Sequence, residues 1–137
     1  MTDHTPSAAS AGTNSGGQGL LGALAGTVTA DGTDLMETRE EAVSWLRTAR
    51  LLPDDAVISG SEHSALLRLR DALREVLAAR TSGAAAPDAT ARLTRALADG
   101  RLVVTVSPAG KAALASSARA SYSNAVAAIA IAVAEAW

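Results

Sequence analysis

The stretch from Glu62 to Arg80, EHSALLRLRDALREVLAAR, decides the fold of this chain. Its large apolar residues recur three or four positions apart, so they lie along one side of an α-helix. They are Leu66, Leu69, Leu73, Val76 and Leu77. Ser59 or Ser61 can cap the start of this helix, and Thr81-Ser82-Gly83 ends it. The stretch therefore predicts a central amphipathic helix around which the rest of the chain packs.

Two shorter segments are expected before this helix. Residues 20–28 are apolar and form a short helix or an extended segment, because their glycines leave the type open. Thr38 and Glu41 have the spacing of a capping box, which predicts a helix over residues 39–50. Pro53 follows closely and disfavours any continuation of that helix.

Two helices and a hairpin are expected after the central helix. Asp88 caps a helix that ends at Gly100 in a left-handed conformation. Residues 101–107 are mostly β-branched and form a strand, which residues 111–117 pair with after a turn. An alanine-rich helix over about 122–135 completes the chain. The predicted class is therefore mainly α with a small β-hairpin (α+β), with about five helical segments around one core.

The composition fits a single domain with a thin core. A length of 137 residues suits one domain, which we expect over residues 20–137. Residues 1–19 are mostly Ser, Thr, Gly, Asn and Ala, and we expect a disordered tail there because they bury too little apolar surface. The chain has 33 alanines and no phenylalanine, so each core residue buries less apolar area than usual.

Several kinds of chemistry are excluded or disfavoured. The absence of cysteine excludes disulfides, thiolate catalysis and Cys-ligated zinc within this chain. The two histidines, His4 and His63, have no partner at metal-ligand spacing, and His63 is expected to be a solvated residue in the first turn of its helix. A G-x-S-x-G elbow is absent. We therefore expect no metal, no cofactor and no enzyme activity.

The charge pattern bears on partners and location. A net charge of −2, with no aromatic residues interleaved among the arginines, argues against direct nucleic-acid binding. The ten-residue apolar run over 125–134 is about half of what a bilayer requires. The N-terminus has no secretory signal. We expect a cytoplasmic protein with no membrane contact.

The central helix also carries the candidate ligand-binding residues. Arg70 and Arg74 lie four positions apart and can hold an anionic ligand through forked hydrogen bonds. The alternative is that they are solvated and pair with glutamates of the preceding helix. Asp71 and Glu75 are expected to pair with arginines three or four positions away. Trp45 is either a core residue or one wall of an apolar pocket.

Three short motifs and their order carry a family resemblance. Gly26-Thr27-Val28 precedes a polar turn, Trp45-Leu46 lies near the end of an acid-capped helix, and Leu69-Arg-Asp-Ala-Leu-Arg74 follows. Over about residues 20–137 this arrangement resembles the ABATE domain. That domain forms the N-terminal half of the CGNR zinc-finger proteins, which are described as stress-induced transcription regulators.

The resemblance implies a ligand-sensing or regulatory domain that takes a small anionic or aromatic ligand. Its expected ligand-binding residues are Thr27, Trp45, Arg70 and Arg74. The family carries a D-x-x-N-T pattern in its first segment. Here Ala23 and Gly26 stand where the Asp and Asn would be, so part of any polar site at that segment is lost.

The resemblance also implies a partner module. Family members continue into a cysteine-rich zinc module that is proposed to bind DNA, whereas this chain ends at Trp137 without a cysteine. A truncated product and a stand-alone regulatory domain both fit, and in either case we expect sensing or association without DNA binding. The alternative function is a protein-interaction or homodimerisation module with no small-molecule ligand, because the small side chains of the last helix permit close approach.

Overall fold

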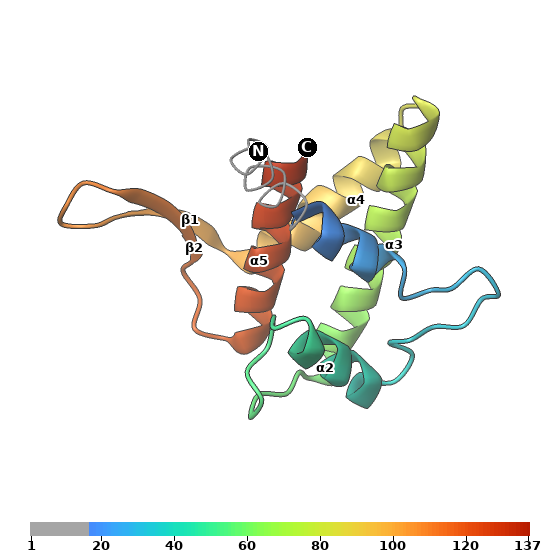
Figure 1. Ribbon diagram of the computed structural model, residues 1–137, viewed down its shortest axis with the longest axis horizontal. Helices are drawn as coiled ribbons and strands as arrows, with labels where there is room; N and C mark the ends of the chain where they lie inside the picture. The colour runs from blue at the N-terminus through green and yellow to red at the C-terminus, as the bar shows by residue number, and fades with distance from the viewer. Residues whose placement is uncertain (1–16) are drawn as a thin grey trace, which may run out of the picture.

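The computed structural model describes residues 17–137. Residues 1–16 of the expected tail lie outside the described residues, and residues 17–25 form a helix that precedes α2. The remaining elements, labelled in Figure 1, are α2 (Arg39–Thr48), α3 (Gly60–Ser82), α4 (Pro87–Leu97), the 3₁₀ turn η1 (Ala98–Gly100), β1 (Leu102–Val106), β2 (Ala112–Ser116) and α5 (Ser121–Ala136). This part of the chain confirms the predicted mainly α class with a small hairpin.

The central helix α3 is capped at both ends as its sequence indicates. Ser59 is the N-cap, and it forms a capping box in which its side chain accepts from the Glu62 amide while Glu62 accepts from the Ser59 amide. Gly83 ends the helix in the left-handed conformation with a φ of 75°. His63 is half-buried rather than solvated, because its Nε2 atom lies 2.9 Å from the Met36 carbonyl oxygen.

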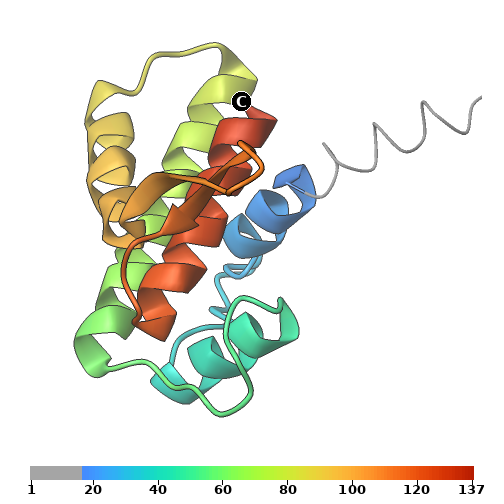
Figure 2. The ribbon, with the colours of Figure 1, turned by 90° about the vertical axis from the view of Figure 1, so that its left-hand side faces the viewer.

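The apolar side of α3 forms the middle of the core. Leu66, Leu69 and Leu73 are almost completely buried. Leu24 from the helix at 17–25 and Ile129 from α5 belong to the same buried cluster. Figure 1 shows the helix at 17–25 in blue, crossing between α5 and α3, and Figure 2 shows it on the side of α5 away from α4. The apolar residues predicted from the sequence to share one side of α3 are therefore the ones that pack against the helix at 17–25 and against α5.

The helix α2 confirms its predicted start. Thr38 and Glu41 form the expected capping box. The helix ends at Thr48 rather than at Arg50, which has a φ of 62° and so cannot continue it. Pro53 lies beyond this turn and is not the cause of the helix end.

The start and end of α4 differ from the prediction. Pro87 is the first residue of the helix, and Asp88, the predicted cap, lies in the first turn without capping it. At the other end, Arg101 and not Gly100 has the left-handed conformation, with a φ of 53°. Gly100 is instead buried against α5, where a Cβ would lie 2.8 Å from the Ala127 amide nitrogen. Its role is close packing, not chain reversal.

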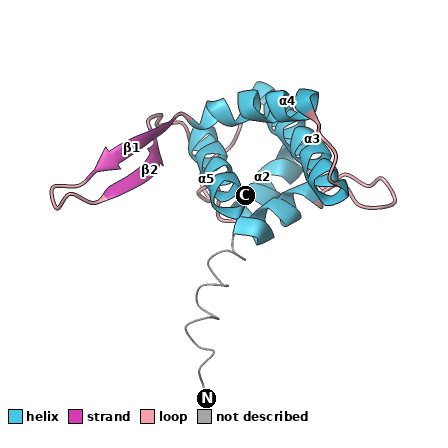
Figure 3. Cartoon of the chain, turned by 90° about the horizontal axis from the view of Figure 1, so that it is seen from above, coloured by secondary structure: helices cyan, strands magenta, loops and turns pink. Residues whose placement is uncertain are grey.

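The hairpin has the predicted strands and projects away from the helices (Figures 1 and 3). The two strands are antiparallel, with Leu102 opposite Ser116 and Val106 opposite Ala112. Val104, Val106 and Leu114 are exposed, because no helix covers either face of the hairpin over most of its length.

The last helix, α5, uses its small side chains within the domain. Its buried residues include Ala125, Ala127 and Ala132, and its exposed ones are Asn124, Ala134 and Glu135. The small side chains of α5 therefore pack closely against η1 and the core of this same chain. No helix in the described part of the chain is long and apolar enough to cross a membrane.

Candidate functional site

Arg70 is at the centre of a buried polar network. Only 4% of its side chain is exposed, and its Nη1 atom lies 2.7 Å from Oδ1 of Asp34. Its Nε atom donates to Asp71 at 3.0 Å, and Nη1 also reaches the Thr27 hydroxyl at 3.5 Å. Thr27 is buried and donates to the Leu24 carbonyl at 2.7 Å. This network fastens the segment after the first helix to the side of α3.

The pKa shifts in the network agree with two ionised partners. The hydrogen bond from Arg70 lowers the pKa of Asp34 below its ordinary value, against the opposing effect of partial burial. Burial by itself would lower the pKa of Arg70, but the bonds to Asp34 and Asp71 outweigh it and raise that pKa. A buried cation with two carboxylate partners has little left to offer a ligand, so the contacts assign Arg70 a structural part.

The predicted ligand-binding residues are thus only partly brought together. Thr27 and Arg70 are in contact, and Arg74 shares an open hollow of about 590 Å³ with Arg70. Val28 and Ala78 also line this hollow, together with Asp71 and Glu75. Trp45 lies elsewhere, partly buried against the core in α2, and lines none of the main hollows on the described residues.

Ion pairing along α3 also differs from the prediction. Asp71 pairs with its neighbour Arg70, and Glu75 pairs with Arg92 of α4, so neither carboxylate pairs with an arginine three or four positions away. Arg74 is exposed and forms no ion pair within residues 17–137, and Arg70 pairs with Asp34 rather than with a glutamate of α2.

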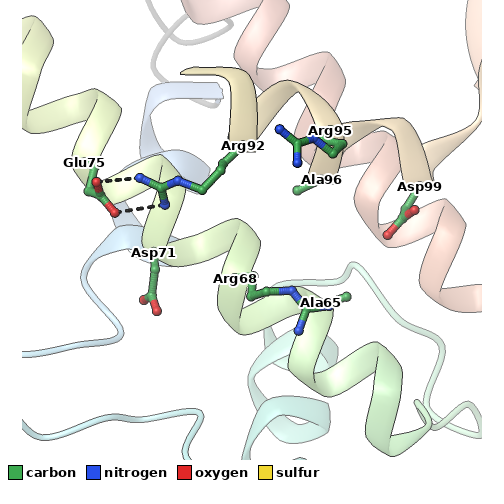
Figure 4. Close-up of a pocket in the computed structure, with 8 residues that line it drawn as sticks. All are labelled: Ala65, Arg68, Asp71, Glu75, Arg92, Arg95, Ala96 and Asp99. Atoms are coloured by element: carbon green, nitrogen blue, oxygen red, sulfur yellow. Dashed lines mark hydrogen bonds and ion pairs between the residues drawn. The ribbon is translucent and has the colours of Figure 1, made fainter. Parts of the chain in front are cut away.

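A second hollow lies between α3 and α4, and it carries more charge than the first. This α3–α4 groove has a volume of about 530 Å³. Its lining residues, drawn in Figure 4, are Ala65, Arg68, Asp71, Glu75, Arg92, Arg95, Ala96 and Asp99. The figure shows Arg68 on the α3 side and Arg95 on the α4 side, with Asp99 toward one end and the Arg92–Glu75 pair at the other.

Half of the six charged residues that line the groove are already paired. Arg92 contacts Glu75 through two hydrogen bonds of 2.8 and 3.1 Å, and Asp71 is bound to Arg70. The Arg92 guanidinium lowers the pKa of Glu75, so both members of that pair are ionised near neutral pH. Within the described residues, Arg68, Arg95 and Asp99 form no ion pair.

Arg68 and Arg95 were not among the ligand-binding residues predicted from the sequence. Arg68 precedes the Leu69–Arg74 motif, and Arg95 lies on a separate helix 27 positions later. Only the packing of α3 against α4 brings them to one groove. One partial signal was present, since Arg92 follows Asp88 by four positions and is paired with it, whereas Arg95 has no acid at that distance before it.

The described residues contain no group of three or more His, Asp or Glu side chains placed to hold a metal ion. The fold and the site together define a small, mainly α-helical domain with a charged surface groove between two of its helices. The chain belongs to the ABATE family, whose model, described as "Putative stress-induced transcription regulator", matches residues 19–137. No curated protein and no solved structure matches the chain.

Proposed function

We propose that this domain is the sensing part of a stress-induced transcription regulator and that it binds a small anion in the α3–α4 groove. The observation that carries the proposal is the pair Arg68 and Arg95, which line one groove from two helices without a carboxylate partner among the described residues. The family supplies the regulatory context. The proposed activity is binding, not catalysis.

The chemistry of the two side chains favours an anion. A guanidinium presents a planar fork of donors that matches a carboxylate or a phosphate, and two such forks can hold one ligand between them. Arg68 and Arg95 are both cations that line the same groove, so an anion that contacts both would neutralise two charges at once. Ala65 and Ala96 also line the groove, and their small side chains leave room for a ligand beside the two arginines.

The proposal moves the site from its predicted place. Arg70 was expected to hold the ligand, but Asp34 and Asp71 already neutralise it. Arg74 lines the other hollow, where its nearest charged neighbours on α3 include the carboxylates of Asp71 and Glu75. Trp45 supplies no wall to either hollow. The α3–α4 groove is the better candidate because two of its arginines, Arg68 and Arg95, form no ion pair among the described residues, whereas the other hollow has one such arginine, Arg74.

A long polyanion fits this groove poorly. Its lining contains three arginines and three carboxylates, so a nucleic-acid backbone would meet as many repulsive as attractive charges. A small ligand can avoid the carboxylates by lying between Arg68 and Arg95. We therefore do not expect this domain to bind nucleic acid directly.

Ligand binding at this groove would fix α4 relative to α3. Arg95 is on α4, which continues through η1 into the exposed hairpin. Because Gly100 of η1 packs tightly on Ala127, a shift of α4 would also change the packing of α5. The proposed signal is therefore a change in the packing of α4 against its two neighbours.

A thermal-shift titration tests this function. Phosphate, sulfate and glutarate are added at constant ionic strength, with chloride as the reference anion. A bound anion at ten times its dissociation constant contributes about 1.4 kcal/mol and raises Tm by roughly 4 °C or more. Arg68→Ala and Arg95→Ala should each remove the shift. Arg119→Ala, which removes an exposed arginine from the loop before α5, should keep it.

Two results would contradict the proposal. The first is that no anion raises the Tm of the wild-type domain more than chloride does, and the second is that the Tm shift survives in the Arg68→Ala, Arg95→Ala double variant. If Arg74→Ala alone removes the shift, the ligand lies in the hollow beside Val28 instead.

A further inference from the structure

The unpaired charges of the α3–α4 groove form a specific pattern. Once the Arg92–Glu75 and Arg70–Asp71 pairs are set aside, two positive groups and one negative group remain. They are Arg68, Arg95 and Asp99. A ligand that complements all three carries two negative charges and one positive charge.

We propose that the groove binds an acidic amino acid, with its two carboxylates on Arg68 and Arg95 and its ammonium group on Asp99. This inference rests on the proposed function, because it names the class of anion that the groove takes. Asp99 is then the specificity-determining residue. It separates a ligand that carries an ammonium group from a plain dicarboxylate of the same length.

The position of Asp99 supports this role. It belongs to η1, directly after α4, and lies at the end of the groove away from the Arg92–Glu75 pair (Figure 4). A dicarboxylate without an ammonium group would approach this carboxylate with no compensating charge, which costs affinity. An ammonium group turns the same contact into a charge-assisted hydrogen bond.

The negative charge of Asp99 affects the pKa of a neighbouring side chain, Tyr122. Asp99 also lines a smaller adjoining hollow of about 270 Å³ together with Glu62, Arg101 and Tyr122. Burial, and after it the negative charges of Asp99 and Glu62, raise the pKa of Tyr122. Asp99 is exposed and forms no ion pair among the described residues, so its carboxylate can accept a hydrogen bond from an ammonium group at this end of the groove.

The size of the groove is compatible with the ligand class. Its volume of about 530 Å³ falls within the usual range for small-molecule sites. The groove is open to solvent along one side, so it can admit a ligand without movement of the backbone. The exposed side chains of Arg68 and Arg95 can adjust to the separation of the two carboxylates.

Isothermal titration calorimetry on the whole chain separates the ligand classes. The titrants are L-glutamate, glutarate, which lacks the ammonium group, and 4-aminobutyrate, which lacks one carboxylate. We expect glutamate to bind about tenfold more tightly than either. Asp99→Asn should remove the preference of glutamate over glutarate, and Asp99→Glu should restore part of it. Asp55→Asn is the matched control, because Asp55 is an exposed acid outside the groove lining and forms no ion pair among the described residues.

The outcomes distinguish this inference from the proposed function. If glutarate binds at least as tightly as glutamate, and Asp99→Asn leaves glutamate binding unchanged, the amino-acid class is wrong while anion binding stands. If none of the three binds and phosphate and sulfate also fail, both proposals are wrong. Circular dichroism of each variant checks that any loss of binding occurs in a folded domain.

Discussion

At the scale of single residues, Arg70 is a predicted ligand-binding arginine that has its carboxylate partners, Asp34 and Asp71, within the protein. Its place on the central helix was readable from sequence, and so was its capacity to bind a carboxylate. Its partner was not, because Asp34 lies 36 positions earlier in a turn that only the folded chain brings against α3. The carboxylate that Arg70 binds belongs to the protein itself.

The Arg70–Asp34 pair predicts an acid-dependent part of the stability. The pKa of Asp34 is lowered from 3.8 in the folded state, so the stabilisation is fully present above that value and is lost as pH falls through the folded pKa. Asp34→Asn should lower the free energy of unfolding by about 2 kcal/mol at neutral pH. The difference from wild type should shrink below about pH 4. Urea denaturation across this pH range measures it.

A graded control belongs with this prediction. Asp71 also bonds to Arg70, but its side chain is 52% exposed, so Asp71→Asn should cost less than Asp34→Asn. If the two variants are equally stable, or if the Asp34→Asn difference grows as the pH falls, the pair does not have the role described.

At the scale of elements, capping and periodicity explain what could be predicted. The boxes at Thr38 and Ser59 start α2 and α3 through contacts three residues apart, and such local contacts are visible in a sequence. The end of α4 was mistaken because its glycine suggested a left-handed terminator. The deciding contact is with Ala127, which is 27 positions away in α5.

The contact between η1 and α5 predicts opposite effects for two glycine substitutions. Gly100→Ala places a methyl group 2.8 Å from the Ala127 amide nitrogen and 2.9 Å from its Cα, so backbone must move and stability should fall by about 2 kcal/mol. Gly22→Ala is the matched control, since Gly22 is helical, exposed and has open space around it. That variant should gain about 1 kcal/mol from helix propensity.

Chemical denaturation of both variants checks this pair of expectations. A neutral Gly100→Ala would mean that η1 is not held against α5, and the proposed route from Arg95 to α5 would lose its basis.

At the scale of the whole molecule, the fold was more predictable than the site. The apolar stripe of α3, the β-branched strand and the turn residues each determine structure locally, so the class and the element order followed from sequence. The α3–α4 groove has no local signature. Its charge depends on which arginines pair with a carboxylate of another helix, as Arg92 pairs with Glu75, and which arginines have no such partner.

The proposed function requires a small anion to bind between Arg68 and Arg95, and amide chemical shifts can locate this anion on the domain. A two-dimensional ¹⁵N–¹H NMR titration of the labelled chain with L-glutamate should perturb amides near Ala65, Arg68, Arg95 and Asp99, with saturation at increasing ligand concentration. The same titration of the Arg68→Ala, Arg95→Ala double variant should leave these amides unchanged. Saturable shifts confined to the surroundings of Val28, Arg74 and Ala78, or no saturable shifts at all, would contradict the account.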